Sequence, residues 1–146
     1  MINKILVPVD GSAHSKKALE FACELAKRFE SELLLLHVVQ PPISTQTMGV
    51  DASVVTTEFR RQDLEEIGRN MIEAAKQITG DHGCKNVETQ IEAGSPAQHI
   101  LDSAKKHNVD LIVMGSRGLT DIAGLLLGSV SHKVTHLAEC SCVTIR

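Results

Sequence analysis

Short apolar, strand-like runs alternate with helically spaced apolar residues along the whole chain, and this alternation limits the fold more than any other feature. The strand-like runs are Ile5–Val9, Leu33–Val39, Val87–Ile91, Val109–Met114 and Cys142–Ile145. A strand followed by a helix and another strand requires crossover connections, which give parallel strands with helices on both faces of the sheet. The sequence therefore predicts an α/β fold around an open, mostly parallel five-stranded sheet.

The stretches between these runs predict four helices. Their apolar residues recur three or four positions apart, which is the spacing of one helix face. They cover approximately residues 18–29, 52–78, 96–106 and 128–138. Ser95 and Pro96 predict the start of the third helix, with serine as its N-cap and proline at the first helical position. No Gly/Ser linker or internal repeat divides the 146 residues, so we expect a single domain over residues 1–146.

Composition argues against several classes of function. The 15 Lys and Arg residues are outnumbered by 18 Asp and Glu, and no long basic run is present, so we expect no nucleic-acid partner. Three Phe, no Trp and no Tyr offer little surface for stacking bases, so a nucleobase would lie on aliphatic walls. The N-terminus lacks the apolar stretch of a signal peptide, and no apolar run reaches membrane-spanning length. We expect a cytoplasmic protein without a membrane partner.

A glycine-rich motif follows the fourth strand-like run and is the strongest functional signal. Gly115-Ser116-Arg117-Gly118 is followed by nine residues and then by Gly128-Ser129 at the start of a predicted helix. Glycines let the main chain approach an anion closely, and the first N–H groups of a helix carry partial positive charge. This layout predicts a phosphate-binding loop. The alternative is that these glycines serve only turns and close packing.

Asp10 is the carboxylate best placed to take part in the same site. It follows the first strand directly, and ligands of open α/β sheets bind outside the carboxyl ends of the strands. If the first and fourth strands are neighbours, as in a flavodoxin-like sheet, Asp10 faces the loop at Gly115. There it could accept hydrogen bonds from a ribose or hold a phosphate-bound Mg²⁺. The alternative is that it caps the turn through Gly11 and Ser12.

The second strand-like run carries one polar side chain, His37. The rest of the run is apolar and short, which is typical of a strand buried on both faces. We therefore expect His37 to be hydrogen-bonded in the core or at the rim of a pocket, with Val38 as a candidate wall for a base.

The common nucleotide-hydrolase and dinucleotide signatures are missing. There is no Gly-x-x-x-x-Gly-Lys-Ser/Thr motif and no Gly-x-Gly-x-x-Gly after the first strand. A general base beside a nucleophile is not evident either, which favours binding over rapid turnover and leaves any enzymatic activity uncertain. We assign no catalytic residue.

Histidines and cysteines near the C-terminus invite a metal or redox interpretation. His132 and His136 lie four apart, as two metal ligands would, but Lys133 stands where a zinc hydrolase needs Glu, and no third ligand is evident. We interpret both histidines as solvated or packing residues and expect no metal site. The thiols of Cys140 and Cys142 match no paired motif and are interpreted as free thiols at the start of a strand.

Taken together, several segments resemble the universal stress protein family. They are Val7-Pro8-Val9-Asp10-Gly11-Ser12, His37-Val38, Gly94-Ser95-Pro96, Asp110–Gly118 and Gly128-Ser129-Val130-Ser131. The resemblance covers essentially the whole chain, and the intact glycine signature is similar to that of the ATP-binding branch. It implies a flavodoxin-like or Rossmann-like sheet with strand order 3-2-1-4-5, which brings Asp10 to the glycine loop.

The resemblance also implies a set of nucleotide-binding residues. Base and ribose would contact Pro8, Val9 and Asp10, and the adenine would lie between Val38 and Met114. Ribose and phosphates would be held by Gly115, Gly118, Gly128, Ser129 and Val130, with Ser116, Arg117 and Ser131 completing the set. The ligand would be ATP, or ADP or AMP, with or without Mg²⁺.

The family commonly dimerises through its last strand, here Val143–Ile145, so the resemblance implies a homodimer. This chain has Cys140-Ser141-Cys142 where the family usually has Cys-Pro before an apolar strand, and loss of the proline frees a backbone N–H at that edge.

Three functions follow as hypotheses. The first is a cytoplasmic, ATP-binding protein that acts as a nucleotide-dependent switch in stress or signalling. The second is slow ATP hydrolysis or phosphoryl transfer near Asp10 and Ser129. The third is a nucleotide-independent interaction module in which residues 40–51 contact a protein partner.

Overall fold

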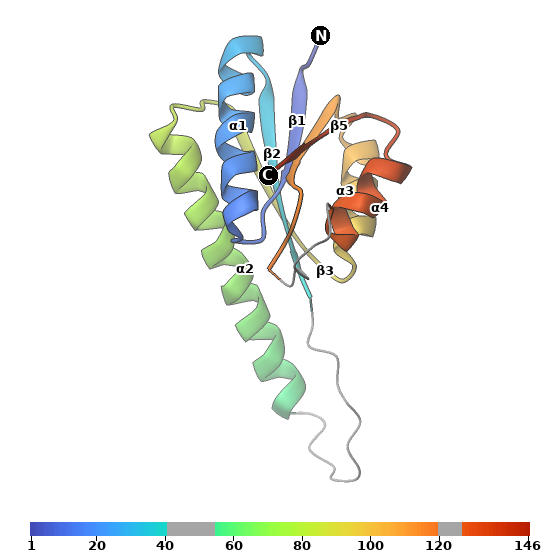
Figure 1. Cartoon of the computed structure of the whole chain (residues 1–146). Helices are drawn as coiled ribbons and strands as arrows, with labels where there is room; N and C mark the ends of the chain where they lie inside the picture. The colour runs from blue at the N-terminus through green and yellow to red at the C-terminus, as the bar shows by residue number, and fades with distance from the viewer. Residues whose placement is uncertain (41–54, 120–126) are drawn as a thin grey trace.

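Strands and helices alternate from end to end of the chain (Figure 1). The computed structural model describes residues 1–40, 55–119 and 127–146. Its elements are β1 (Lys4–Pro8), α1 (Ala13–Phe29), β2 (Glu32–Val39), α2 (Val55–Asp81), β3 (Val87–Ala93), α3 (Pro96–Lys106), β4 (Leu111–Gly115), α4 (Ser129–Leu137) and β5 (Ser141–Ile145). All five predicted strands and four predicted helices are confirmed, within a few residues at most boundaries. The predicted start of the second helix near Ala52 lies outside the described residues.

The five strands form one parallel sheet in the order β3-β2-β1-β4-β5, as the family resemblance implied. Helices α1 and α2 cover one face of the sheet, and α3 and α4 cover the other (Figure 1). Successive residues of β1 alternate between the two faces: Ile5 and Val7 pack under α1 and α2, whereas Leu6 packs under α3 and α4. This double burial explains why the central strands are apolar throughout.

Local signals fix the ends of the helices. Ser12 is the N-cap of α1, and its Oγ accepts a 3.1 Å hydrogen bond from the N–H of Ser15. Ser95 occupies the predicted N-cap position of α3 and Pro96 follows it, but the Ser95 hydroxyl makes no capping hydrogen bond. Because proline has no N–H to satisfy, the first turn of α3 loses less from this missing bond.

Asp110 ties β4 to β1 at the amino ends of the strands. Its Oδ2 accepts hydrogen bonds from the backbone N–H groups of Asn3 at 2.7 Å and Lys4 at 3.0 Å. These two bonds favour the ionised carboxylate, and they lower the pKa of Asp110 below its ordinary value of 3.8. The same contact orders the start of the chain next to the sheet.

Within residues 1–40, 55–119 and 127–146, none of the helices combines the length and apolar character needed to cross a bilayer.

Candidate functional site

A cavity of about 220 Å³ opens at the carboxyl ends of β1, β2 and β4. Its described lining comprises Pro8, Val9, Asp10, Ser15, Leu36, Val38, Gln40, Pro96, Ile100, Met114, Gly115, Arg117, Gly118, Leu119, Gly128, Ser129, Val130 and Ser131. These residues come from both halves of the chain, and the order β2-β1-β4 at the centre of the sheet brings them together. The position is the one at which open α/β sheets bind ligands.

Asp10 serves two purposes at the edge of the cavity. Its Oδ1 accepts a 2.9 Å hydrogen bond from the N–H of Ser12, so the turn-capping alternative is correct for this oxygen. Its Oδ2 lies 3.0 Å from the position that a Cβ on Gly118 would occupy. The carboxylate therefore braces its own turn and also reaches the glycine loop, as the predicted strand order required.

Different constraints explain the glycines at the two ends of the loop Gly115–Gly118. A Cβ on Gly115 would lie 2.9 Å from the backbone carbon of His14 and the backbone nitrogen of Ser15, so this glycine lets α1 pack closely against β4. A Cβ on Gly118 would meet Asp10 Oδ2 among the described atoms, and Gly118 is exposed at the cavity. Close packing explains Gly115, whereas access to the cavity fits Gly118.

Hydrogen bonds join the glycine loop to the first turn of α4. The carbonyl of Ser116 accepts hydrogen bonds from the N–H of Gly128 at 2.6 Å and from the Oγ of Ser131 at 2.8 Å. The N–H of Ser116 donates to the carbonyl of Ile145 at 2.7 Å, at the end of β5. Ser116 thus connects β4, α4 and β5, and it holds the N-terminus of α4 at the cavity, where the first helical N–H groups favour an anion.

Aliphatic side chains also line the cavity. They are Leu36, Val38, Met114 and Ile100, from β2, β4 and α3. Beside them, His37 is buried, and its Nδ1–H donates a 2.7 Å hydrogen bond to the carbonyl of Val9. The prediction of a hydrogen-bonded core histidine is confirmed, and this bond ties the end of β2 to the end of β1.

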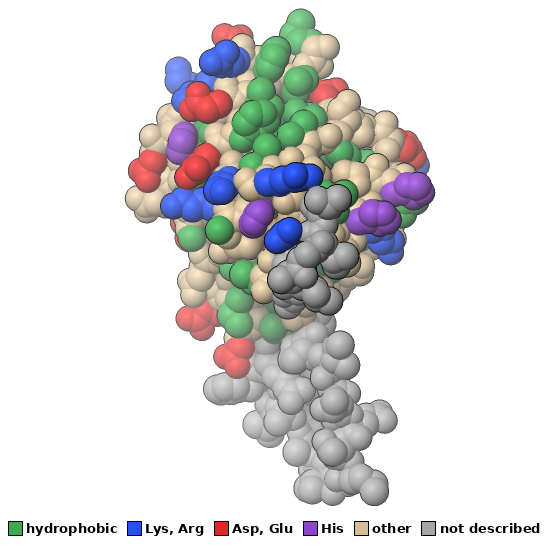
Figure 2. Space-filling model, in the orientation of Figure 1, with side chains coloured by type: hydrophobic (Ala, Val, Ile, Leu, Met, Phe, Trp, Pro, Cys, Tyr) green, Lys and Arg blue, Asp and Glu red, His purple; other side chains and the backbone are tan. Residues whose placement is uncertain are grey.

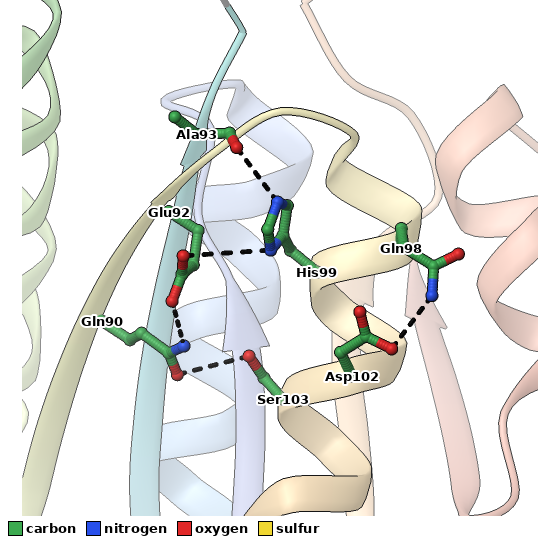
Figure 3. A network of polar contacts seen from close by, with 7 residues as sticks. All are labelled: Gln90, Glu92, Ala93, Gln98, His99, Asp102 and Ser103. Carbon is green, nitrogen blue, oxygen red and sulfur yellow. Dashed lines mark hydrogen bonds and ion pairs between the residues drawn. The ribbon is translucent and has the colours of Figure 1, made fainter.

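A polar network fixes α3 against β3 and thereby positions the cavity residues that α3 carries (Figure 3). The Nε2 of His99 donates to the carbonyl of Ala93 at 3.1 Å, and Gln90 contacts both Glu92 at 2.7 Å and Ser103 at 3.3 Å. Pro96 and Ile100, which line the cavity, lie on this same helix.

Every predicted site residue except Ser116 lies on the cavity lining. Ser116 is completely buried, and its Oγ lies 3.3 Å from His14 Nδ1 instead. Residues that the prediction missed also line the cavity: Ser15, Leu36, Gln40, Pro96, Ile100 and Leu119. The start of α3 at Pro96 could have been included from sequence, because helix starts that follow strand ends lie at this edge of the sheet.

The remaining candidate residues lie away from the cavity. His132 and His136 are exposed on α4, and their rings stack with centroids 6.3 Å apart. Over the described parts of the chain, no three His, Cys, Asp or Glu side chains are grouped to hold a metal ion. Cys140 and Cys142 carry free thiols at the start of β5, as predicted.

The chemistry of the lining suits a ligand with an apolar body and an anionic end. Among the described lining residues, the titratable side chains are Asp10 and Arg117, and the hydroxyls come from Ser15, Ser129 and Ser131. Aliphatic side chains from β2, β4 and α3 and residues of the glycine loop and the start of α4 make up most of the remaining lining. Such a combination of apolar walls and a few polar groups is typical of small-molecule sites.

Comparison with known proteins agrees with this arrangement. The model of the universal stress protein family matches residues 1–146. Universal stress protein YxiE of Bacillus subtilis is 39% identical over 149 residues, and the match covers 100% of both chains.

Solved structures share the fold. Universal stress protein UspA from Lactobacillus plantarum superposes with a TM-score of 0.82 at 28% identity, covering 99% of this chain and 98% of that one. A universal stress protein family protein from Arabidopsis thaliana, solved with AMP bound, has a TM-score of 0.67 at 26% identity, covering 98% of this chain and 90% of that one. The strand order, the family match over the whole chain and the full-length relative lead to one conclusion: the chain belongs to the universal stress protein family.

Proposed function

We propose that this protein binds ATP, or a related adenine nucleotide, in the cavity at the carboxyl ends of the strands. The observation that carries the proposal is the meeting of Asp10 Oδ2 with Gly118 beside the N-terminus of α4. A carboxylate next to a helix N-terminus can accept ribose hydroxyls while helical N–H groups receive the phosphates. The AMP bound to the Arabidopsis relative supports an adenine nucleotide as the ligand class.

The walls of the cavity suggest how the nucleotide lies. The adenine rests between Val38 and Met114, with Pro8 and Val9 beside it, and Asp10 receives the ribose. The phosphates lie along the glycine loop and the start of α4. The residues that hold them are Gly115, Arg117, Gly118, Gly128, Ser129, Val130 and Ser131, while Ser116 orders the loop from beneath. Mg²⁺, where it is used, accompanies the phosphates near Asp10.

The same proposal includes a switch, in which the bound nucleotide alters the protein's association with itself or with another protein in a stress response. Ser116 links the start of α4 at the cavity to β5. Its carbonyl accepts a hydrogen bond from the N–H of Gly128, and its N–H donates to the carbonyl of Ile145. β5 is an edge strand, and hydrophobic side chains gather on the face that carries it (Figure 2). Half-buried Val143 and Ile145 belong to this strand. We place a homodimer contact there, since an open edge readily pairs with a second strand.

The unit of function in this proposal is one domain over residues 1–146, and its compartment is the cytoplasm. The four cysteines are free in the structure, which suits a compartment that keeps thiols reduced. The suggested partner contact through residues 40–51 lies almost entirely outside the described residues and takes no part in the proposal.

Gly118→Val tests the placement of the phosphates. The new Cβ would lie 3.0 Å from Asp10 Oδ2, and the branched side chain would fill space that the loop leaves open to the cavity. By titration calorimetry, we expect nucleotide affinity to fall at least tenfold, which corresponds to about 1.4 kcal/mol.

Gly80→Val is the matched control, because a Cβ at Gly80 in α2 meets no atom within 4 Å. The control should bind nucleotide as the parent protein does. Equal affinity in both variants, with the Gly118 variant shown to be folded by circular dichroism, would rule out the placement of the phosphates.

A further inference from the structure

Two cysteines that lie far apart in sequence meet on the face of the sheet covered by α1 and α2. Cys23 lies in α1 and is completely buried, while Cys84 lies in the turn between α2 and β3 and is partly exposed. Cys84 packs against the same apolar core that contains Cys23, close enough for the two thiols to interact. Both are free thiols in the structure.

The turn that carries Cys84 is ordered by its own hydrogen bonds. The N–H of Cys84 donates to the carbonyl of Thr79 at 2.9 Å, and the N–H of Gly83 donates to the carbonyl of Gly80 at 2.9 Å. The Thr79 hydroxyl, in turn, donates to the carbonyl of Lys76 at 2.8 Å. The backbone at Cys84 is therefore ordered where this residue packs against the core that contains Cys23.

Charged side chains surround the exposed side of this pair. Lys27 lies one turn after Cys23 on α1 and pairs with Glu24 at 2.6 Å, and His82 Nδ1 lies 3.7 Å from the same Glu24 carboxylate. The contact between His82 and Glu24 joins the turn that precedes Cys84 to α1, next to Cys23.

The two thiols are unequal. Burial, followed by the contact with Cys84, raises the pKa of the Cys23 thiol, so Cys23 is protonated near neutral pH and does not react first. Cys84 is the thiol that solvent reaches. An exposed first thiol beside a buried second one is the arrangement of a peroxide-reactive cysteine and its resolving cysteine.

We propose that Cys23 and Cys84 form a reversible, hydroperoxide-sensitive pair that closes to a disulfide joining α1 to the α2–β3 turn. In the first step, the Cys84 sulfur attacks one peroxide oxygen, the O–O bond breaks, and a sulfenic acid forms with release of water. In the second step, the Cys23 sulfur attacks the Cys84 sulfur, the S–O bond breaks, and a second water leaves with the Cys23 proton. Two electrons pass from the two sulfurs to the peroxide.

Closure requires only a local movement. Cys84 already packs against the core that contains Cys23, and the two sulfurs must approach to the disulfide bond length of about 2.05 Å. The turn after α2 is at the surface, whereas Cys23 is held in the core, so the turn moves toward the helix. The bond would close a long loop of the chain, and such bonds stabilise a fold mainly by limiting the unfolded state.

The test is peroxide treatment of the intact, pre-reduced protein with hydrogen peroxide, followed by alkylation, digestion and mass spectrometry. We expect one linked pair of peptides that contains Cys23 and Cys84, formed with the loss of two hydrogen atoms and reversed by dithiothreitol. Cys140 and Cys142 should remain open to alkylation. The melting temperature of the oxidised form should rise by several degrees, up to roughly 10 °C.

Matched variants assign the bond. Cys84→Ser should abolish the linked peptides and the rise in melting temperature, and Cys140→Ser should leave both unchanged. Oxidation that stops at Cys84 without a link to Cys23 would overturn the proposal. A bond that involves Cys140 or Cys142 in the wild-type protein, or no oxidation under peroxide, would overturn it as well.

Discussion

Asp10 offers the sharpest test of the site, because its two carboxylate oxygens have separable tasks. Oδ1 accepts the N–H of Ser12 at 2.9 Å, and Oδ2 is directed at Gly118 and the cavity. Asp10→Asn keeps an oxygen that can accept the Ser12 bond but replaces the second acceptor by an NH₂ donor. Asp10→Ala removes both groups. Comparison of the two variants therefore separates the turn from the ligand.

The two variants should differ in folding free energy but not in nucleotide-binding free energy. Loss of the turn bond in Asp10→Ala should cost about 1 kcal/mol of folding free energy, and this bond is retained in Asp10→Asn. Loss of a charged acceptor for the ribose hydroxyls should cost about 1.5–3 kcal/mol of binding free energy in both variants. That cost corresponds to an affinity about 10- to 150-fold weaker.

Two assays suffice for this comparison. Denaturant unfolding should show Asp10→Asn close to the parent and Asp10→Ala less stable, and calorimetry should show both variants weak in nucleotide binding. If Asp10→Asn binds as tightly as the parent protein, Oδ2 does not receive the ribose. If Asp10→Ala unfolds like the parent, Oδ1 does not support the turn.

Three further changes probe the frame around the site. Gly115→Ala puts a Cβ 2.9 Å from the backbone of His14, so α1 must shift and unfolding free energy should fall by about 1–3 kcal/mol. Ser131→Ala removes a buried hydroxyl that donates to the carbonyl of Ser116 at 2.8 Å, and thermal unfolding should show a loss of about 1 kcal/mol. Asp110 has a lowered pKa, so its stabilising bonds are intact above its ordinary pKa of 3.8 and are lost as the pH falls through the lower, folded value. Acid unfolding of Asp110→Asn should therefore show a smaller loss of stability in this acidic range than the parent does.

Much of the fold could be predicted from the sequence, because the pattern of apolar residues reports burial directly. The apolar run from Leu33 to Val39, interrupted only by His37, predicts a strand covered on both faces, and β2 indeed packs against two cores. The strand order could not be predicted in this way, because the alternation of strands and helices does not say which strands are neighbours in the sheet. It came from the family resemblance, and the structure confirms it.

The candidate site was predictable where a residue's position along a strand fixes its place. The proximity of Asp10 and Gly118 could be predicted once the first and fourth strands were assumed to be neighbours. The inward direction of Ser116 could not, because its burial depends on contacts with His14 and Ile145, which are remote in sequence. The packing of Cys84 against the core that contains Cys23 could not be predicted for the same reason, since it depends on how α1 packs beside the α2–β3 turn.

The proposal that the cavity holds an adenine nucleotide is best tested by measuring the binding of ATP, ADP and AMP to the parent protein. The measurement is titration calorimetry with and without Mg²⁺, on protein first stripped of any nucleotide that co-purifies. We expect saturable binding with one nucleotide per chain, weakened in Gly118→Val and Asp10→Asn. The absence of binding by any of the three nucleotides to folded protein would contradict it.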